Sequence, residues 1–256
     1  MIQDIPSSLS CFPEASPAKG DYVFQSKGDN IALTPWSRAA KVTQPLVKVG
    51  ETTLFLGAAP DPIWSDTQYL RRLPSADLRF AGFCANHLSR WLLNHRWCGK
   101  CGALLTFKGA SLHCTACNHE IFPVISPAVI VGILHQGRLL ITRYADRPYR
   151  GPALVAGYCE VGESAEATCI REAFEETGLH LTRLRYFASQ PWGLSGSLLL
   201  GYFAECSDAE VRLNDGELSE ALWLAPDEVP PPPDPCGALS LTATMIQAFA
   251  RGETLL

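Results

Sequence analysis

The most informative stretch of the sequence runs from Gly157 to Leu179 and reads GYCEVGESAEATCIREAFEETGL. Ser164 is a favoured N-cap residue and Gly178 suits a left-handed C-cap, so this stretch predicts a helix over residues 164–177. One side of that helix is apolar, and we expect it to be buried. It consists of Cys169, Ile170, Ala173 and Phe174.

Three carboxylates cluster on another face of the predicted helix. Glu172, Glu175 and Glu176 stand at positions i, i+3 and i+4, within a single helical turn. Like charges at this spacing repel, and the negative end of the helix dipole adds to the cost. A divalent cation would relieve both effects, and hard oxygen ligands favour Mg²⁺ or Mn²⁺. A solvated acidic face is the alternative interpretation; the glycine-containing loop before the helix favours the metal site.

The overall composition limits the classes of protein to which the chain can belong. Its 256 residues are 47% hydrophobic and 18% charged, which is typical of a globular protein. Ten cysteines are too few for a disulfide-dense scaffold, and the first residues lack a secretory pattern, so we expect a cytoplasmic protein. No apolar stretch approaches the roughly 20 residues of a membrane span. A formal net charge of −5 means that a phosphate-bearing partner must be bound locally, by arginines or a metal ion.

Four of the cysteines form two Cys-x-x-Cys pairs. Cys98 and Cys101 are separated by twelve residues from Cys114 and Cys117, a spacing that brings four thiolates to one ion. A four-sulfur shell fits Zn²⁺ and leaves no coordination position for water, so the predicted zinc is structural. A redox pair or disulfides are the competing interpretations, but a redox motif needs only one pair. His113 and His119 flank the second pair and are the alternative ligands.

The remaining patterns divide the chain into three predicted domains. Residues 1–95 contain short apolar or alternating segments at 32–34, 46–49 and 52–56, followed by an amphipathic helix from Ser75 to about Arg96, and form a small β-rich domain. Residues 96–122 form the zinc ribbon. The third domain is 123–256.

The third domain is predicted to mix strands and helices. Two β-branched runs, 128–134 and 138–142, predict a hairpin with the three-residue loop His135-Gln136-Gly137. Further strands are expected at 154–156, 198–204 and 221–224. A proline linker at 230–235 precedes a terminal helix at 239–250.

The stretch that begins at Gly157 resembles the Nudix box of the Nudix hydrolases, in which a glycine and a glutamate precede Arg-Glu-x-x-Glu-Glu-x-Gly and an aliphatic residue. The resemblance implies an α/β/α sandwich that holds Mg²⁺ or Mn²⁺ and hydrolyses a nucleoside diphosphate linked to another group. It assigns Glu172 and Glu176 to the metal and Glu176 or Glu175 to proton removal from water. The matching positions are Gly157, Glu163, Arg171, Glu172, Glu175, Glu176, Gly178 and Leu179. Of these, Glu163 is expected to pair with Arg171 and shape the loop.

A four-cysteine zinc ribbon directly before a Nudix domain resembles the NADH pyrophosphatases, which also carry a β-rich N-terminal domain, and this resemblance covers essentially the whole chain. These enzymes carry a Ser-Gln-Pro-Trp-Pro-Phe-Pro-x-Ser array after the box. Here the array reads SQPWGLSGS from Ser189 to Ser197, and it departs from the pattern at Gly193, Leu194 and Ser195. The resemblance implies further metal ligands at Glu217 and the carbonyl of Ala156. It also implies substrate contacts from Arg71, Phe122, Tyr158, Gln190, Pro191, Trp192 and Ser197.

The function implied is metal-dependent hydrolysis of NAD(H) to AMP and nicotinamide mononucleotide, and removal of NAD caps from RNA as its extension. Arg143, Arg147 and Arg150 are the arginines near the site that could meet RNA. Arg71 is expected to reach across from a partner subunit, since the resemblance implies a homodimer. The altered array leaves another substrate, such as ADP-ribose, as one alternative. A catalytically silent zinc-ribbon module that binds nucleic acid or a regulatory partner is the second.

Overall fold

The computed structural model describes residues 6, 8–146, 151–213, 216–231 and 240–253. By their internal contacts these residues form two compact units. The amino-terminal unit holds the described residues up to Ile125 together with Trp192–Gly196, and the carboxy-terminal unit holds Ser126–Pro191 and the described residues from Ser197 onwards. Within the described residues, no helix is long and apolar enough to cross a membrane.

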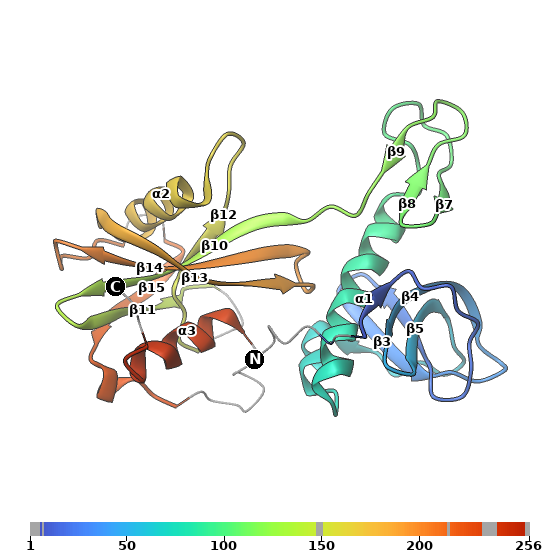
Figure 1. Cartoon of the computed structure of the whole chain (residues 1–256), viewed down its shortest axis with the longest axis horizontal. Helices are drawn as coiled ribbons and strands as arrows, with labels where there is room; N and C mark the ends of the chain where they lie inside the picture. The colour runs from blue at the N-terminus through green and yellow to red at the C-terminus, as the bar shows by residue number, and fades with distance from the viewer. Residues whose placement is uncertain (1–5, 7, 147–150, 214–215, 232–239, 254–256) are drawn as a thin grey trace. The chain divides into compact units, whose positions relative to one another are not determined.

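The amino-terminal unit is built on a mixed sheet with the strand order β1-β4-β5-β2-β3-β6, which confirms the predicted β-rich region (Figure 1). Helix α1 (Ala76–Asn94) contacts β4, β5 and β2. It begins as predicted, because the Ser75 hydroxyl accepts a hydrogen bond from the Leu78 amide at 3.1 Å. The strands are β1 (Ser10–Cys11), β2 (Tyr22–Lys27), β3 (Asn30–Pro35), β4 (Lys41–Val49), β5 (Thr52–Ala58) and β6 (Ser65–Asp66), and a 3₁₀ helix, η1 (Thr67–Arg72), precedes α1.

The cysteine pairs lie in a small three-stranded sheet that follows α1. Its strands are β7 (Thr106–Lys108), β8 (Ser111–His113) and β9 (Glu120–Ile121). Trp91 of α1, which is buried, packs with Leu105, Leu112 and two of the cysteines in one apolar cluster. This cluster is small, so the segment depends on whatever joins its cysteines for much of its stability.

The carboxy-terminal unit is a mixed sheet between two helices, which confirms the expected α/β/α sandwich (Figure 1). The strand order is β13-β14-β10-β11-β15, and β12 also pairs with β10. One face packs on α2 (Ala165–Thr177) through Cys169 and Ala173, and the other packs on α3 (Leu241–Ala250) through Met245 and Phe249. The strands are β10 (Ser126–His135), β11 (Arg138–Tyr144), β12 (Val155–Tyr158), β13 (Leu181–Trp192), β14 (Ser197–Cys206) and β15 (Leu218–Leu224).

The hairpin between β10 and β11 differs from the sequence prediction in its loop. His135 pairs with Arg138, so the connection has two residues rather than three. Gln136 and Gly137 have φ values of 47° and 75°. Two consecutive positive φ values belong to a type I′ turn, whose twist matches that of the flanking strands.

The prediction for the buried side of α2 is wrong at two of its four positions. Cys169 and Ala173 are fully buried, but Ile170 and Phe174 are 46% and 48% exposed. The sheet covers only a narrow stripe of the helix, and Phe174 instead stacks on His180 with ring centroids 4.9 Å apart. The predicted proline linker extends into 232–239, which lies outside the described residues.

Candidate active site and metal centre

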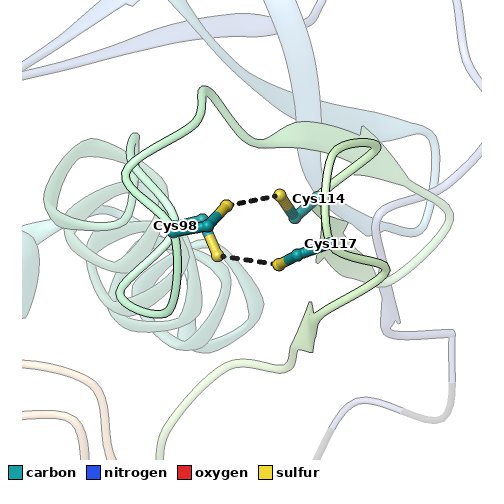
Figure 2. Close-up of side chains that lie close together, drawn as sticks. Cys98, Cys114 and Cys117 are labelled. Carbon is teal, nitrogen blue, oxygen red and sulfur yellow. Dashed lines mark hydrogen bonds between the residues drawn. The ribbon is translucent and has the colours of Figure 1, made fainter.

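The four cysteines of the two pairs come together as predicted. Their sulfur atoms all lie within 4.8 Å of one another, with 3.7 Å between Cys98 and Cys117 and 3.5 Å between Cys101 and Cys114 (Figure 2). Four sulfurs at about 2.3 Å from one ion in a tetrahedron are about 3.8 Å apart, so the cluster fits Zn²⁺. Within the part of the chain that the structure describes, it is the only such group of three or more His, Cys, Asp or Glu side chains.

The two cysteine pairs share one backbone geometry. The residue after each pair, Gly102 and Asn118, has a left-handed φ of 76° and 57°. Each donates its amide hydrogen to the carbonyl of the first cysteine of its pair, at 2.8 Å in both cases. Both positions carry a signal in the sequence, because glycine favours a left-handed φ and asparagine is the residue that most readily replaces it there.

Backbone amides also act on one of the sulfurs directly. Burial raises the pKa of the Cys114 thiol, but hydrogen bonds from the amides of Cys117 and Ala116 and from Cys101 outweigh it and lower the pKa to about 6. A thiolate rather than a thiol is the ligand that a metal requires. The loop thus favours the ligating form of this cysteine.

Helix α2 begins and ends where the sequence predicts. The Ser164 side chain accepts from the Ala167 amide at 3.2 Å, and Gly178 takes a left-handed φ of 72° and donates to the Phe174 carbonyl. These caps fix the helix against β12, and therefore fix the carboxylates of its last two turns relative to the loop that precedes it.

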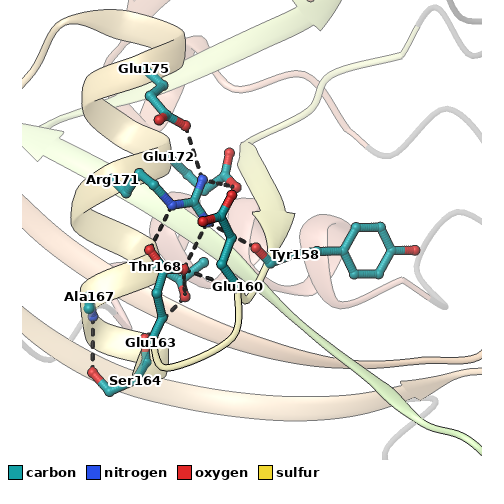
Figure 3. A network of polar contacts seen from close by, with 9 residues as sticks. All are labelled: Tyr158, Glu160, Glu163, Ser164, Ala167, Thr168, Arg171, Glu172 and Glu175. Atoms are coloured by element: carbon teal, nitrogen blue, oxygen red, sulfur yellow. Dashed lines mark hydrogen bonds and ion pairs between the residues drawn. The ribbon is translucent and has the colours of Figure 1, made fainter.

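Arg171 is the centre of a polar network that joins this loop to the helix (Figure 3). Its guanidinium donates to both Glu163 oxygens at 2.7 and 2.9 Å, which confirms the expected pair, and to the Tyr158 carbonyl at 3.0 Å. It also donates to Glu172 at 2.7 Å and Glu175 at 3.0 Å. Hydrogen bonding to Arg171 and to the Glu160 amide lowers the pKa of Glu163 to about 2. Glu163 therefore stays ionised and holds the arginine in place.

Gly157 lies directly against the Glu172 carboxylate. A Cβ atom built on Gly157 would be 2.0 Å from Cδ and Oε1 of Glu172, which no real pair of atoms tolerates. The glycine of the box therefore allows the close approach of the carboxylate and is not needed for a left-handed φ, so a larger residue would displace Glu172. Burial raises the pKa of Glu172, and the charges of Glu175 and Glu217 raise it further, against the effect of Arg171. The carboxylates thus repel one another at the position where the sequence predicts a cation.

The other predicted metal and catalytic residues differ in their environments. Glu176 is buried, with 3% of its surface exposed, whereas the Glu175 side chain is 53% exposed. Ala156 lies on β12 and pairs with Ile130 of β10. Glu217, which directly precedes β15, is exposed, and its carbonyl accepts from the Ala145 amide. The glutamate side chains are not gathered as closely as the cysteines, because Glu172 turns towards Arg171 and Gly157.

Four of the predicted substrate-contacting residues lie in the carboxy-terminal unit with these glutamates. Tyr158 is 53% exposed, so it is not a core residue, and its hydroxyl lies 3.2 Å from the buried Ser197 hydroxyl. Gln190 is 1% exposed, and its side-chain oxygen accepts from the Leu241 amide at the start of α3. Pro191 follows it on β13.

The other three lie in the amino-terminal unit. Phe122 is 60% exposed and is likewise not a core residue. The Arg71 guanidinium lies 5.5 Å from the centre of the Trp192 ring of the same chain, within the range of a cation–π contact.

Of the arginines considered for RNA, Arg143 pairs with Glu220 at 2.7 Å, and Arg147 and Arg150 lie outside the described residues.

Comparison with known proteins agrees with this geometry. A family model described as the NUDIX domain matches residues 125–243. The NAD-capped RNA hydrolase NudC of Mannheimia succiniciproducens is 38% identical over 150 residues, 55% of this chain and 56% of that protein. The protein of the same name from Haemophilus influenzae (strain PittGG) is 34% identical over 158 residues, 60% of each chain. This chain thus spans less than two thirds of the length of both relatives.

A longer match comes from the NAD-capped RNA hydrolase NudC of Actinobacillus succinogenes, which is 34% identical over 187 residues, 70% of this chain and 70% of that protein. Among solved structures, the crystal structure of a NUDIX hydrolase from Nitrosomonas europaea is similar at 20% identity with a TM-score of 0.46, over 53% of this chain and 80% of that one. The family model and the longer sequence match, together with the geometry of the box, lead to one conclusion: the chain belongs to the NUDIX family.

Proposed function

We propose that this protein hydrolyses the diphosphate bond of NAD(H), giving AMP and nicotinamide mononucleotide, and that it also removes NAD caps from the 5′ ends of RNA. The observation that carries the proposal is the close approach of Glu172 to Gly157, braced by Arg171 and Glu163. The relatives named NAD-capped RNA hydrolase support the choice of substrate.

The donor set of the site suits Mg²⁺ or Mn²⁺, because it consists of carboxylate and carbonyl oxygens, the hard ligands that these ions prefer. Glu172, Glu176, Glu217 and the Ala156 carbonyl would hold the ions. When bound, such an ion polarises a diphosphate and lowers the pKa of a coordinated water. The same chemistry explains how a chain with a net charge of −5 can accept an anionic substrate.

The other roles in catalysis and substrate binding fall to different residues of the chain. A glutamate must accept the proton of the attacking water, and Arg171 already holds Glu175 at 3.0 Å, so we assign this role to Glu176. Glu163 and Arg171 keep the loop in register with α2. Tyr158 and Phe122 would contact the nucleotide, since exposed aromatic rings suit stacking on a base. Arg71 and the array from Gln190 to Ser197 are proposed contacts on the resemblance alone.

The proposal includes three further parts. The four cysteines bind one structural Zn²⁺ per chain, as their sulfur spacing supports. The protein acts in the cytoplasm. It forms a homodimer, which light scattering would test directly.

The decisive variant is Glu176→Gln, which keeps the size of the side chain but removes the carboxylate. We expect turnover of NADH with Mg²⁺ or Mn²⁺ to fall at least about 100-fold, as for loss of a positioned base or metal ligand. Glu166→Gln is the matched control, because Glu166 lies in the first turn of the same helix and hydrogen-bonds Tyr202 instead. Near-normal turnover of Glu176→Gln would contradict the assignment.

A substrate panel separates the alternatives. Hydrolysis of ADP-ribose in preference to NADH would assign the site to another nucleoside diphosphate derivative, and the altered residues at 193–195 are the feature that would favour it. Hydrolysis of none of the substrates with either metal would favour a silent module.

A further inference from the structure

The part of the array that departs from the family pattern forms a compact turn. Trp192–Gly196 falls in the amino-terminal unit, although the residues on both sides of it belong to the other unit. The amides of Ser195 and Gly196 donate to the Trp192 carbonyl at 3.3 and 3.0 Å, and Gly196 has a left-handed φ of 78°. The turn is thus closed on itself by backbone hydrogen bonds.

One face of helix α1 contacts this turn at Trp192, Gly193, Leu194 and Gly196. The contacting residues stand at positions i, i+3, i+4 and i+7, so they form a single stripe. The Phe83 ring lies 5.4 Å from the Trp192 ring, and a Cβ on Gly196 would be 3.1 Å from the His87 ring. The α1 stripe consists of Phe83, Asn86, His87 and Arg90.

Two members of the α1 stripe bind carbonyl groups of the turn. The Asn86 side-chain amide donates to the Gly193 carbonyl at 2.8 Å, and this hydrogen bond is buried. The Arg90 guanidinium donates to the Leu194 carbonyl at 3.0 Å at the surface. Because both bonds are to backbone carbonyls, they hold the path of the turn directly.

The glycine at 193 and the α1 stripe are parts of one feature. A Cβ on Gly193 would lie 2.0 Å from the Phe83 carbonyl oxygen, a backbone atom that cannot move aside. A proline, which the resembling array has at this position, carries a Cβ and could not make this approach. Glycine at position 193, where the array has proline, therefore allows helix α1 to pack directly against the backbone of the turn.

Asn86 is a poor choice for stability alone. It is fully buried, and its side-chain oxygen has no hydrogen-bond partner among the described residues. A buried polar atom without a partner costs free energy, whereas an apolar residue of the same size would not. The hydrogen bond to Gly193 gives the asparagine a role in placing the turn.

We propose that Asn86, supported by Phe83 and Arg90, is a positioning residue that holds the Trp192–Gly196 turn and thereby sets substrate affinity. The chain enters this turn from Gln190 and Pro191 and leaves it into Ser197, and all three, with Trp192, are proposed substrate contacts. The proposal rests on the proposed function for the identity of the substrate. Asn86 acts through the turn and does not touch the reacting atoms. We therefore expect it to affect the KM of the substrate and not the rate of the chemical step.

The test compares Asn86→Ala and Asn86→Leu with Ser89→Ala. Ser89 is the matched control because it is fully buried on the same helix, but its hydroxyl donates to the Asn86 carbonyl and not to a carbonyl of the turn. We expect both Asn86 variants to raise KM for NADH about tenfold, the effect of one unsatisfied buried carbonyl. We expect kcat to stay within about twofold, since uniform binding is lost. Ser89→Ala should change neither.

Hydrogen exchange provides a readout that needs no substrate. In the Asn86 variants, the amides of Ser195 and Gly196 should exchange faster, while those of α2 should not change. Arg90→Ala, a surface change that cannot prevent folding, should raise exchange at the same amides to a smaller extent. Gly193→Ala should raise KM, and adding Asn86→Ala to it should add little, because both release the same turn.

The outcomes are distinguishable. Unchanged exchange in the turn, unchanged KM, or a loss confined to kcat would overturn the positioning role. If the wild-type protein hydrolyses no NADH but the turn loses protection in the Asn86 variants, the proposed substrate is wrong and the positioning role stands.

Discussion

Replacing Gly157 by alanine changes one atom at the centre of the candidate site. The new Cβ would be 2.0 Å from Cδ of Glu172, and ordinary contact begins at 3.4 Å, so the carboxylate would have to move by about 1.4 Å. The backbone itself accommodates alanine, because Gly157 does not have a positive φ. The substitution therefore displaces a proposed metal ligand without straining the loop.

We expect Gly157→Ala to lower kcat about 100-fold, which is the cost of a displacement of about 1 Å in a catalytic site and equals ~2.7 kcal/mol. The assay is release of AMP from NADH as a function of Mn²⁺ concentration, with a thermal melt to check the fold. The apparent affinity for Mn²⁺ should fall in parallel. Combined with Glu172→Gln, the alanine should cause little further loss, since its target is already disabled.

Two results would refute this reasoning. Wild-type kcat in Gly157→Ala would mean that Glu172 can move without consequence and is not a metal ligand. A full additional loss in the double variant would mean that Gly157 acts through some other group.

Three further predictions follow from the same contacts. Cys114→Ser should lower the zinc content below one ion per chain and lower the melting temperature, because a structural metal contributes to folding. Metal analysis and calorimetry would measure the two effects. A stable variant that keeps its full zinc content would contradict the prediction. The low pKa of Glu163, about 2 against an ordinary 4.5, means that its contribution to stability is complete above pH 4.5 and is lost as the pH falls towards 2. The melting temperatures of the wild type and of Glu163→Gln should therefore converge as the pH falls through this range. A difference in melting temperature that stays constant with pH would mean that the Glu163–Arg171 pair does not stabilise the fold. Glu175→Gln should reduce turnover less than Glu176→Gln does; the reverse order would reassign the base.

The sequence predicted the site well where the chemistry is local. Helix α2 has a serine and a glycine at its ends whose preferences depend only on their own backbone. The cysteine pairs are equally local, since four thiolates at this spacing have few other uses. The Arg171–Glu163 pair came from the resemblance, and the structure adds that the same guanidinium binds Glu172 and Glu175.

The parts that were missed depend on tertiary contacts. Strand β13 carries Arg183 and Arg185 and lacks a buried alternating pattern, because it is an edge strand of its sheet. The exposure of Ile170 and Phe174 reflects how little of α2 the sheet covers, which periodicity does not reveal. The contact of Gly193 with the Phe83 carbonyl joins residues that are far apart in the sequence.

The most direct measurement is identification of the products formed from NADH, NAD⁺, NAD-capped RNA and ADP-ribose with Mg²⁺ or Mn²⁺. We expect metal-dependent release of AMP and nicotinamide mononucleotide from the free dinucleotide and removal of the cap from the RNA, with both activities lost in Glu176→Gln. Hydrolysis of ADP-ribose alone, or metal-independent release of AMP, would contradict it.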